Sequence, residues 1–183
     1  MSHKTETSRP RPTALEIDPS SPGTIVRAAM LLESCFNIFL AHGMFFHPHD
    51  TSVQLFFDGA TTAASPSVAD AALVSLLMQW IGTWTVATTV PLLLALPNRP
   101  GAIEKRVTAY TALGTMEALF VPFLVYHARA EGGGAAGLSW EKVFGGLVVP
   151  MVGALTFRLW VLFVKPGWMG RYRVVGGSAG KEG

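Results

Sequence analysis

Residues 140–164 read WEKVFGGLVVPMVGALTFRLWVLFV, and this stretch decides the class of fold. After Lys142, its one charged side chain is Arg158. A helix needs about 20 mostly apolar residues to cross the hydrocarbon core of a bilayer, and this stretch is long enough. Its apolar residues occupy most of the helix circumference, so no single buried stripe can be distinguished. The stretch therefore predicts a membrane-spanning helix.

Three further windows have the same character: Thr24 to Phe46, Val68 to Leu96, and Ala102 to His127. The composition agrees, because 50% of the residues are hydrophobic and 14% are charged, against about 25% charged in typical soluble domains. Prolines inside the spans are expected to kink the helices. We predict an all-α integral membrane four-helix bundle with kinked helices over residues 23–166. The prolines concerned are Pro91, Pro122 and Pro150.

The two tails complete the expected organisation. Residues 1–22 are rich in Ser, Thr and Pro, which predicts a disordered tail, and residues 167–183 form a basic tail. The first tail has no apolar core of a cleavable signal peptide, so the first span is expected to act as a signal anchor. Eleven Lys and Arg lie near span ends on the side of both termini, against only Arg129 and Lys142 on the opposite side. The bias predicts that both termini are cytosolic, and we expect the membrane to be the endoplasmic reticulum.

Composition also excludes several classes of function. The single cysteine, Cys35, rules out an intrachain disulfide framework and any multi-cysteine metal site. The net charge is +2 and no long basic block is present, so nucleic acid is not an expected partner. The run FHPHD at residues 46–50 contains side chains that bind metals, but proline interrupts it and such runs are common in loops. We expect no metal site and no cofactor.

Three ionisable side chains lie inside the predicted spans, where each is a functional-site hypothesis because of its cost in lipid. Counted from the cytosolic ends, Glu33 lies roughly 13 Å deep, Arg158 roughly 10 Å and Glu117 roughly 18 Å. The similar depths predict that the three side chains meet inside the bundle.

Uncharged polar residues accompany this cluster. Asn37 is one turn from Glu33 on the same helix face, and Tyr110 shares the face of Glu117. Gln79 lies roughly 25 Å from the cytosolic end and is expected nearer the luminal side. Small residues in the fourth span are expected to let helices approach closely. They are Gly145, Gly146, Gly153 and Ala154.

The cluster has two interpretations. In the first, Arg158 pairs with a carboxylate to fix the helix register, and Asn37 and Gln79 form interhelical hydrogen bonds. In the second, Arg158 keeps one carboxylate ionised while the other becomes a neutral acid, which separates an acid from a base. Such a pair can protonate an epoxide or alkene and remove a proton elsewhere. Either glutamate could take either role.

Two short motifs resemble a known family. Gly82-Thr83-Trp84-Thr85 resembles the F-G-x-W-T segment of the small four-span scaffold proteins of ergosterol biosynthesis. Met116 to Phe120 is similar to a Ser-Glu-aromatic stretch there, and Asn37 falls near that family's first-span Asn. The resemblance covers residues 24–164. It implies a non-catalytic tether for membrane-bound biosynthetic enzymes. Glu33 and Arg158 depart from the family's pattern.

The size, orientation and membrane acids also look like the small integral-membrane epoxide-opening cyclases and hydrolases of terpenoid and polyketide pathways. We therefore predict an enzyme of secondary-metabolite biosynthesis that performs epoxide opening, cyclisation or isomerisation on a lipophilic small molecule in contact with membrane lipids. Partnership with other membrane-bound biosynthetic enzymes is expected if the chain is instead a scaffold, and a transporter would require an oligomer. The candidate catalytic residues are Glu33, Glu117, Arg158 and Asn37. The candidate substrate contacts are Tyr110, Gln79 and Trp84, although a packing or interface position is the favoured interpretation of Trp84.

Overall fold

The computed structural model describes residues 14–57, 68–129 and 138–175 of the chain. Four of its helical runs are long and apolar enough to cross a membrane, as predicted. The first three are α1 (Thr24–Phe46), α3 (Val68–Ala95) and α4 (Ala102–Arg129). The fourth run, Trp140–Val164, consists of α5 (Trp140–Val143), η2 (Phe144–Val148), α6 (Val149–Leu159) and η3 (Trp160–Val164). The chain is thus an all-α, multi-pass membrane protein.

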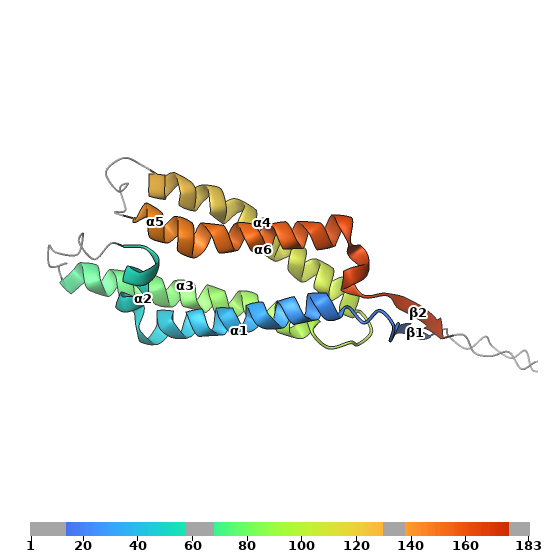
Figure 1. Ribbon diagram of the computed structural model, residues 1–183. Coiled ribbons are helices and arrows are strands. Elements are labelled where there is room, and N and C mark those ends of the chain that lie inside the picture. Colours follow the sequence, from blue (N-terminus) through green and yellow to red (C-terminus); the bar gives the residue numbers. More distant parts are fainter. Residues whose placement is uncertain (1–13, 58–67, 130–137, 176–183) are drawn as a thin grey trace, which may run out of the picture.

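The helices associate as two pairs (Figure 1). α1 packs along α3, α4 packs along α6, and α3 joins the pairs by packing on α4. Large apolar side chains point away from the bundle, and Leu32 and Phe163 are 74% and 78% exposed. Exposure of this extent around the circumference suits a lipid environment.

Two small cores lie toward opposite ends of the bundle. The first includes Val26, Leu92 and Val161, and the second is formed by Val143 and Val148 with Ala128. The middle of the bundle, between these cores, contains the buried Arg158 and the two glutamates that it contacts.

Proline acts differently in the three spans that contain it. α3 and α4 continue as helices through Pro91 and Pro122. In the fourth span, the turn before Pro150 is π-helical, and the Val149 N–H donates to the carbonyl of Phe144. Pro150 has no N–H to donate, so a wider turn accommodates it. A second π turn, η3, begins two residues after Arg158.

A short helix that the sequence analysis did not predict follows the first span. α2 (Pro48–Leu55) begins with Pro48 in its first turn and has Asp50 there as well. Proline at the first helical position and an acidic residue in the first turn both favour a helix start. The start of α2 therefore explains why proline and aspartate occur in the run FHPHD, whose side chains include types that bind metals. Lys142 donates to the carbonyls of Val53 and Phe57 and thereby fixes the end of α2 to the fourth span.

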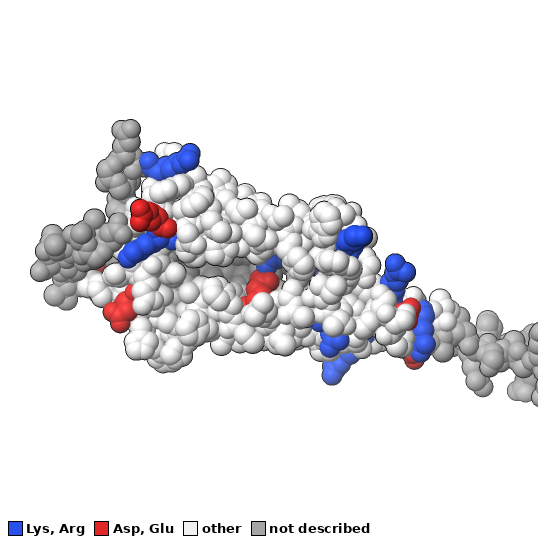
Figure 2. All heavy atoms as spheres, in the orientation of Figure 1, with Lys and Arg blue, Asp and Glu red and all other residues white. Residues whose placement is uncertain are grey.

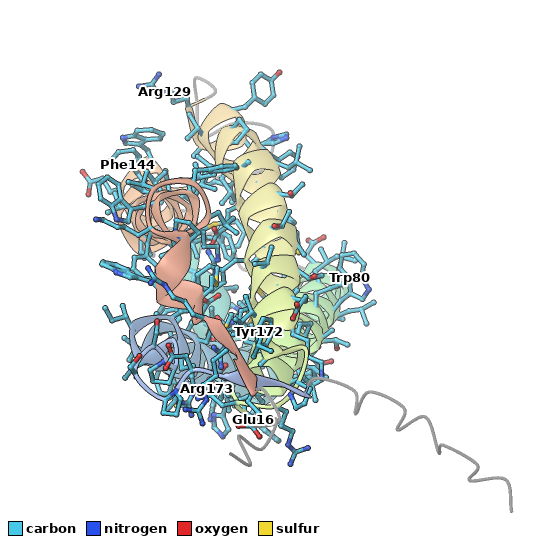
Figure 3. The ribbon with its side chains drawn as sticks, turned by 90° about the vertical axis from the view of Figure 1, so that its right-hand side faces the viewer. Glu16, Trp80, Arg129, Phe144, Tyr172 and Arg173 are labelled. Atoms are coloured by element: carbon cyan, nitrogen blue, oxygen red, sulfur yellow. The ribbon has the colours of Figure 1, made fainter. Side chains whose placement is uncertain are left out.

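The prediction of a wholly disordered N-terminal tail is wrong for its last part. β1 (Ala14–Ile17) pairs antiparallel with β2 (Tyr172–Val175), which follows the 3₁₀ turn η4 (Pro166–Met169). Glu16 lies opposite Arg173 in this ladder, with an ion-pair distance of 3.6 Å between Oε2 and Nη2. Figure 3 shows both side chains at this end of the molecule. The strands pair because both tails leave the bundle at the same end. The remainder of the predicted tails, residues 1–13 and 176–183, lies outside the described residues.

Candidate functional site

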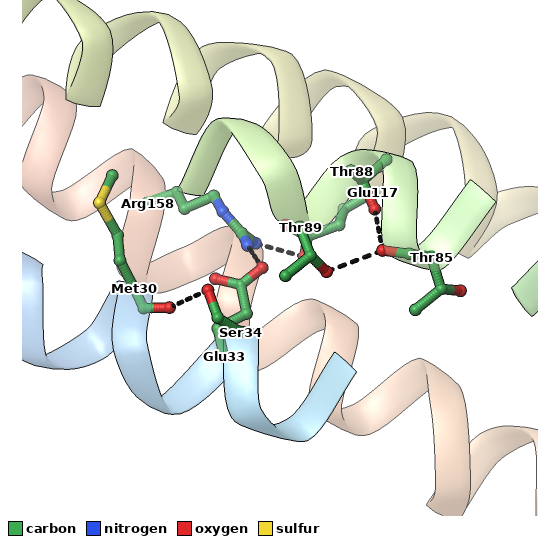
Figure 4. Close-up of polar contacts among 8 residues, drawn as sticks. All are labelled: Met30, Glu33, Ser34, Thr85, Thr88, Thr89, Glu117 and Arg158. Carbon is green, nitrogen blue, oxygen red and sulfur yellow. Dashed lines mark hydrogen bonds and ion pairs between the residues drawn. The ribbon is translucent and has the colours of Figure 1, made fainter. Parts of the chain in front are cut away.

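Arg158 is the centre of the candidate site. It projects from the last turn of α6 and is almost fully buried. Its Nη2 is ion-paired with Oε1 of Glu33 on α1, and its Nη1 with Oε1 of Glu117 on α4 (Figure 4). The prediction that these three side chains meet inside the bundle is confirmed. One guanidinium thus joins three of the four spans.

One face of α4 holds the arginine in place. Tyr110, Gly114 and Glu117 are spaced at i, i+4 and i+7, so they share that face. The guanidinium carbon of Arg158 lies 5.6 Å from the centre of the Tyr110 ring, within the range of a cation–π contact. A Cβ on Gly114 would lie 3.8 Å from Cδ of Arg158. The arginine stem thus passes within ordinary van der Waals distance of the Gly114 position, between the tyrosine and the glutamate.

The two glutamates differ in their access to the surroundings. The side chain of Glu33 is 26% exposed and that of Glu117 is 13% exposed, whereas that of Arg158 is 2% exposed. Among the described residues, the second carboxyl oxygen of Glu117 and Nε of Arg158 are buried without a hydrogen-bond partner. Glu33 is therefore the more accessible of the two acids.

The charges of the cluster do not balance if both acids are ionised. Arg158 supplies one positive charge against two carboxyl groups, and an unpaired charge in a dry site is costly. One proton on either of the two carboxyl groups makes the cluster neutral. A neutral cluster therefore has one carboxylate and one carboxylic acid on the same guanidinium, and such a pair suits acid–base chemistry.

A groove runs between α1 and α6 and reaches the ion cluster. Its volume is about 640 Å³, within the range of about 300–1,000 Å³ found for small-molecule sites. Figure 2 shows the hollow as the one place in the middle of this face where acidic and basic side chains gather, surrounded by uncharged residues. The groove walls are largely apolar. Its lining includes Leu32 and Phe36 from α1, with Gly153, Ala154 and Phe157 from α6.

Two of the predicted accessory residues belong to this groove. Asn37 lies one turn beyond Glu33 and is half-buried in the lining. Tyr110 also contributes to the lining, behind the arginine. The structure thus brings together Asn37, Tyr110 and the three charged residues.

The other two predicted substrate contacts lie elsewhere. Gln79 donates from Nε2 to the carbonyl of Phe45 over 3.4 Å, at the contact between α3 and α1. Trp84 is exposed on α3 and forms an edge-to-face pair with Trp80 at 6.1 Å. Figure 3 shows Trp80 pointing away from the bundle. Neither Gln79 nor Trp84 lines the groove.

The glycine of the resemblance motif has a packing explanation. A Cβ on Gly82 would lie 3.1 Å from Cβ of Met44, so glycine is what allows α3 to approach α1 this closely. The motif Gly82 to Thr85 therefore combines a close helix contact with an outward-facing tryptophan.

The expected packing role of the small residues in the fourth span is wrong for its glycines. A Cβ on Gly145, Gly146 or Gly153 would meet nothing within 4 Å outside its own helix turn. These glycines adjoin open space rather than a neighbouring helix. Gly153 faces the groove, so it leaves volume for a ligand. The sequence could not distinguish these two uses of glycine, because both need a small residue on one helix face.

Arg106 is a buried residue that the sequence analysis counted only as an interfacial charge. It is fully buried, and its guanidinium donates to the carbonyls of Ala95, Met169 and Pro22 at 3.1, 2.6 and 3.3 Å. It also bonds the side chain of Asn98 and the carbonyl of Leu96. Its partners flank the starts and ends of the spans, so Arg106 fastens this end of the bundle. It has no place in the groove.

The run FHPHD lies at the end of α1 and the start of α2, in the described part of the chain. There, no group of three or more His, Cys, Asp and Glu side chains is placed to hold a metal ion. The rings of His42 and His47 lie 6.3 Å apart, and that of His42 also contacts Phe46 at 4.9 Å.

Comparison of the chain with protein-family models, with curated proteins and with solved structures gives no match. The resemblances described above therefore depend on the quoted residues alone, and the site must be interpreted from its own geometry.

Proposed function

We propose that the chain is a membrane-embedded enzyme that acts on a lipophilic small molecule by acid–base chemistry. The observation that carries this proposal is the pair of carboxyl groups sharing one buried guanidinium at the wall of an apolar groove. A register-fixing ion pair needs one acid, whereas this cluster has two. The second acid makes the cluster able to store and transfer a proton.

The proposed roles follow from exposure. Glu33, the more exposed acid, transfers the proton to and from the substrate. Glu117 and Arg158 are positioning residues that hold the compensating charge behind it. Asn37, half-buried one turn away, is placed to donate a hydrogen bond to the oxygen of a substrate.

Epoxide opening with cyclisation or isomerisation is the reaction class that suits these groups. The carboxylic acid of Glu33 protonates the epoxide oxygen, the carbon–oxygen bond breaks, and the resulting cation is attacked by an alkene of the same molecule. The carboxylate of Glu33 then removes a proton from carbon, which restores the acid. The product is an isomer of the substrate, so the cycle consumes no redox equivalent.

We place the protein in the membrane of the endoplasmic reticulum with both termini in the cytosol. The charge bias supports this orientation, and the pairing of β1 with β2 keeps the two tails at one end. A terminal tag should then be accessible to protease in sealed microsomes. Glycosylation of an acceptor site engineered into the N-terminal tail would show that the protein has the opposite orientation.

The test of the activity uses conservative variants in liposomes that contain only this protein. Candidate substrates are isoprenoid and polyketide epoxides. An acid or base in the rate-limiting step contributes about 10²–10⁴-fold, so Glu33→Gln should lose most product formation. Glu117→Gln should also lose product formation, because Glu33 then balances Arg158 as a carboxylate and no neutral acid remains. Glu104→Gln is the matched control on α4, since Glu104 contacts Tyr172 outside the groove. Wild-type turnover by Glu33→Gln would reject the proposal.

A scaffold is the second candidate, and the exposed pair Trp80 and Trp84 favours it. Two large aromatic side chains on one outer helix face are a suitable contact for a partner helix. Under this alternative, Trp80→Ala with Trp84→Ala should release partner enzymes and reduce pathway output. Glu33→Gln should leave both unchanged.

A further inference from the structure

A second cavity, the inner cavity, meets the groove at the acid pair Glu33 and Glu117. It has a volume of about 220 Å³ and is lined by residues of α1, α2, α3, α4 and the fourth span. Glu33, Asn37 and Glu117 line both this inner cavity and the groove. The carboxyl groups therefore lie between two spaces rather than at the end of one.

The walls of the inner cavity are also largely apolar. Leu113 and Phe120 line it from α4. Thr85 and Thr88 line it from α3, but their hydroxyl groups donate to carbonyls of their own helix, those of Ile81 and Thr85. Apart from the acid pair and Asn37, the inner cavity thus offers few free polar groups to a ligand.

One glycine of the fourth span borders each space. Gly153 lines the groove and Gly146 lines the inner cavity, and a Cβ on either would meet no atom within 4 Å. Gly145, beside Gly146, has equally open surroundings but lines neither space. The chain therefore supplies a matched set of three glycines, of which two adjoin the proposed binding space.

We infer that the groove and the inner cavity together bind one elongated apolar molecule, which lies across Glu33 and Glu117. The oxygen function of this molecule is at an internal position of its carbon chain rather than at the end. The longer arm occupies the groove and the shorter arm occupies the inner cavity, in keeping with their volumes. This inference rests on the proposed function and names the shape of its substrate.

The position of the groove gives the route of access. It lies between α1 and α6, and the side chains on its rim, such as Leu32 and Phe36, are exposed to the surroundings of the bundle. In a bilayer those surroundings are acyl chains. An apolar molecule dissolved in the bilayer therefore reaches the acid pair laterally, through the groove between α1 and α6, without crossing water.

The experiment measures at which position along the carbon chain of the ligand the oxygen function must lie. The probes are long-chain alcohols with a diazirine beside the hydroxyl carbon, and the hydroxyl lies at the chain end, a few carbons from the end, or at the centre. The protein is reconstituted in phosphatidylcholine vesicles, irradiated with each probe, and mapped by mass spectrometry. The near-end form should label peptides that contain Glu33 or Glu117 more strongly than the terminal form.

The glycine variants show whether the short arm uses the inner cavity. Gly146→Leu fills that cavity, and losing the burial of about two methylenes weakens binding about tenfold. The near-end form should therefore lose its advantage over the terminal form. Gly146→Ala should give a smaller change in the same direction, and it guards against a folding defect in the leucine variant because alanine favours a helix. Gly153→Leu should weaken labelling by all three forms, and Gly145→Leu should change nothing.

The outcomes separate this inference from the proposed function. Equal labelling by the three forms, or an unchanged preference in Gly146→Leu and Gly146→Ala, would overturn the inference even if Glu33→Gln abolishes turnover. A preserved positional preference with full turnover in Glu33→Gln would support the binding geometry and reject the catalytic proposal.

Discussion

Arg158 is ion-paired with Glu33, a residue 125 positions earlier in the chain, across the groove between α6 and α1. The same guanidinium binds Glu117 on α4, the helix that packs along α6. A charged contact thus connects the two helix pairs at the place where apolar packing leaves a space. The contact that holds this side of the bundle together is also the one that a substrate would meet.

The first prediction concerns the stability that the cluster provides. Arg158→Leu leaves the negative charge of the two carboxyl groups without a partner. Breaking a buried ion pair in this way costs about 3–5 kcal/mol in the free energy of unfolding. Arg158→Leu combined with Glu33→Gln and Glu117→Gln should recover most of that loss, because no unpaired charge remains. Unfolding in mixed micelles measures both variants. With Glu33→Gln and Glu117→Gln measured singly as well, strictly additive effects of the three substitutions would show that the side chains do not interact.

The second prediction compares two glycines. Gly82→Ala places a Cβ 3.1 Å from Cβ of Met44, so α3 and α1 must move apart, and overpacking of this kind costs about 1–3 kcal/mol. Gly145→Ala adds a Cβ in open space, and alanine favours a helix over glycine by up to about 1 kcal/mol. Melting temperatures in detergent should therefore fall for the first variant and stay level or rise for the second. Equal effects would contradict the assigned packing.

Much of the fold could be predicted because membrane spans carry a strong sequence signal. Long apolar windows interrupted by turn residues determine the four helices, and the cost of burying Glu33, Glu117 and Arg158 in lipid predicts that they pair. Helix rise then gives their depths along the bundle. Each of these arguments needs only local sequence and one physical rule.

The features that were missed depend on which helix faces meet. Gly82 and Gly146 are both glycines within apolar stretches of sequence. Gly82 contacts a neighbouring helix, whereas Gly146 adjoins a cavity. Gln79 and Trp84 are polar or aromatic residues in a span, but their faces turn away from the groove. Helices that are apolar all round carry no stripe to define orientation, so these distinctions need the assembled bundle.

Arg106 shows the same limit for a charged residue. Its position near a span end predicts an interfacial cation, and its neighbour Lys105 is indeed exposed. Arg106 instead turns inward, because the carbonyls at the end of α3 and around η4 need donors. Two consecutive residues of α4 thus differ in their surroundings: Lys105 is exposed, whereas Arg106 forms a buried cross-link.

The last prediction tests that cross-link. Arg106→Leu leaves the buried carbonyls of Ala95 and Met169 without a donor, and each unsatisfied group costs about 1–3 kcal/mol. Arg106→Lys keeps the charge but cannot reproduce the planar fork of donors, so it should recover only part of the loss. Lys105→Leu removes the same charge from the adjacent, exposed position and should leave the free energy of unfolding nearly unchanged. Protease sensitivity of β1 and β2 should rise in Arg106→Leu, because η4 leads directly into β2 and loses its anchor. Equal stability of Arg106→Leu and Lys105→Leu would mean that the buried arginine contributes charge alone.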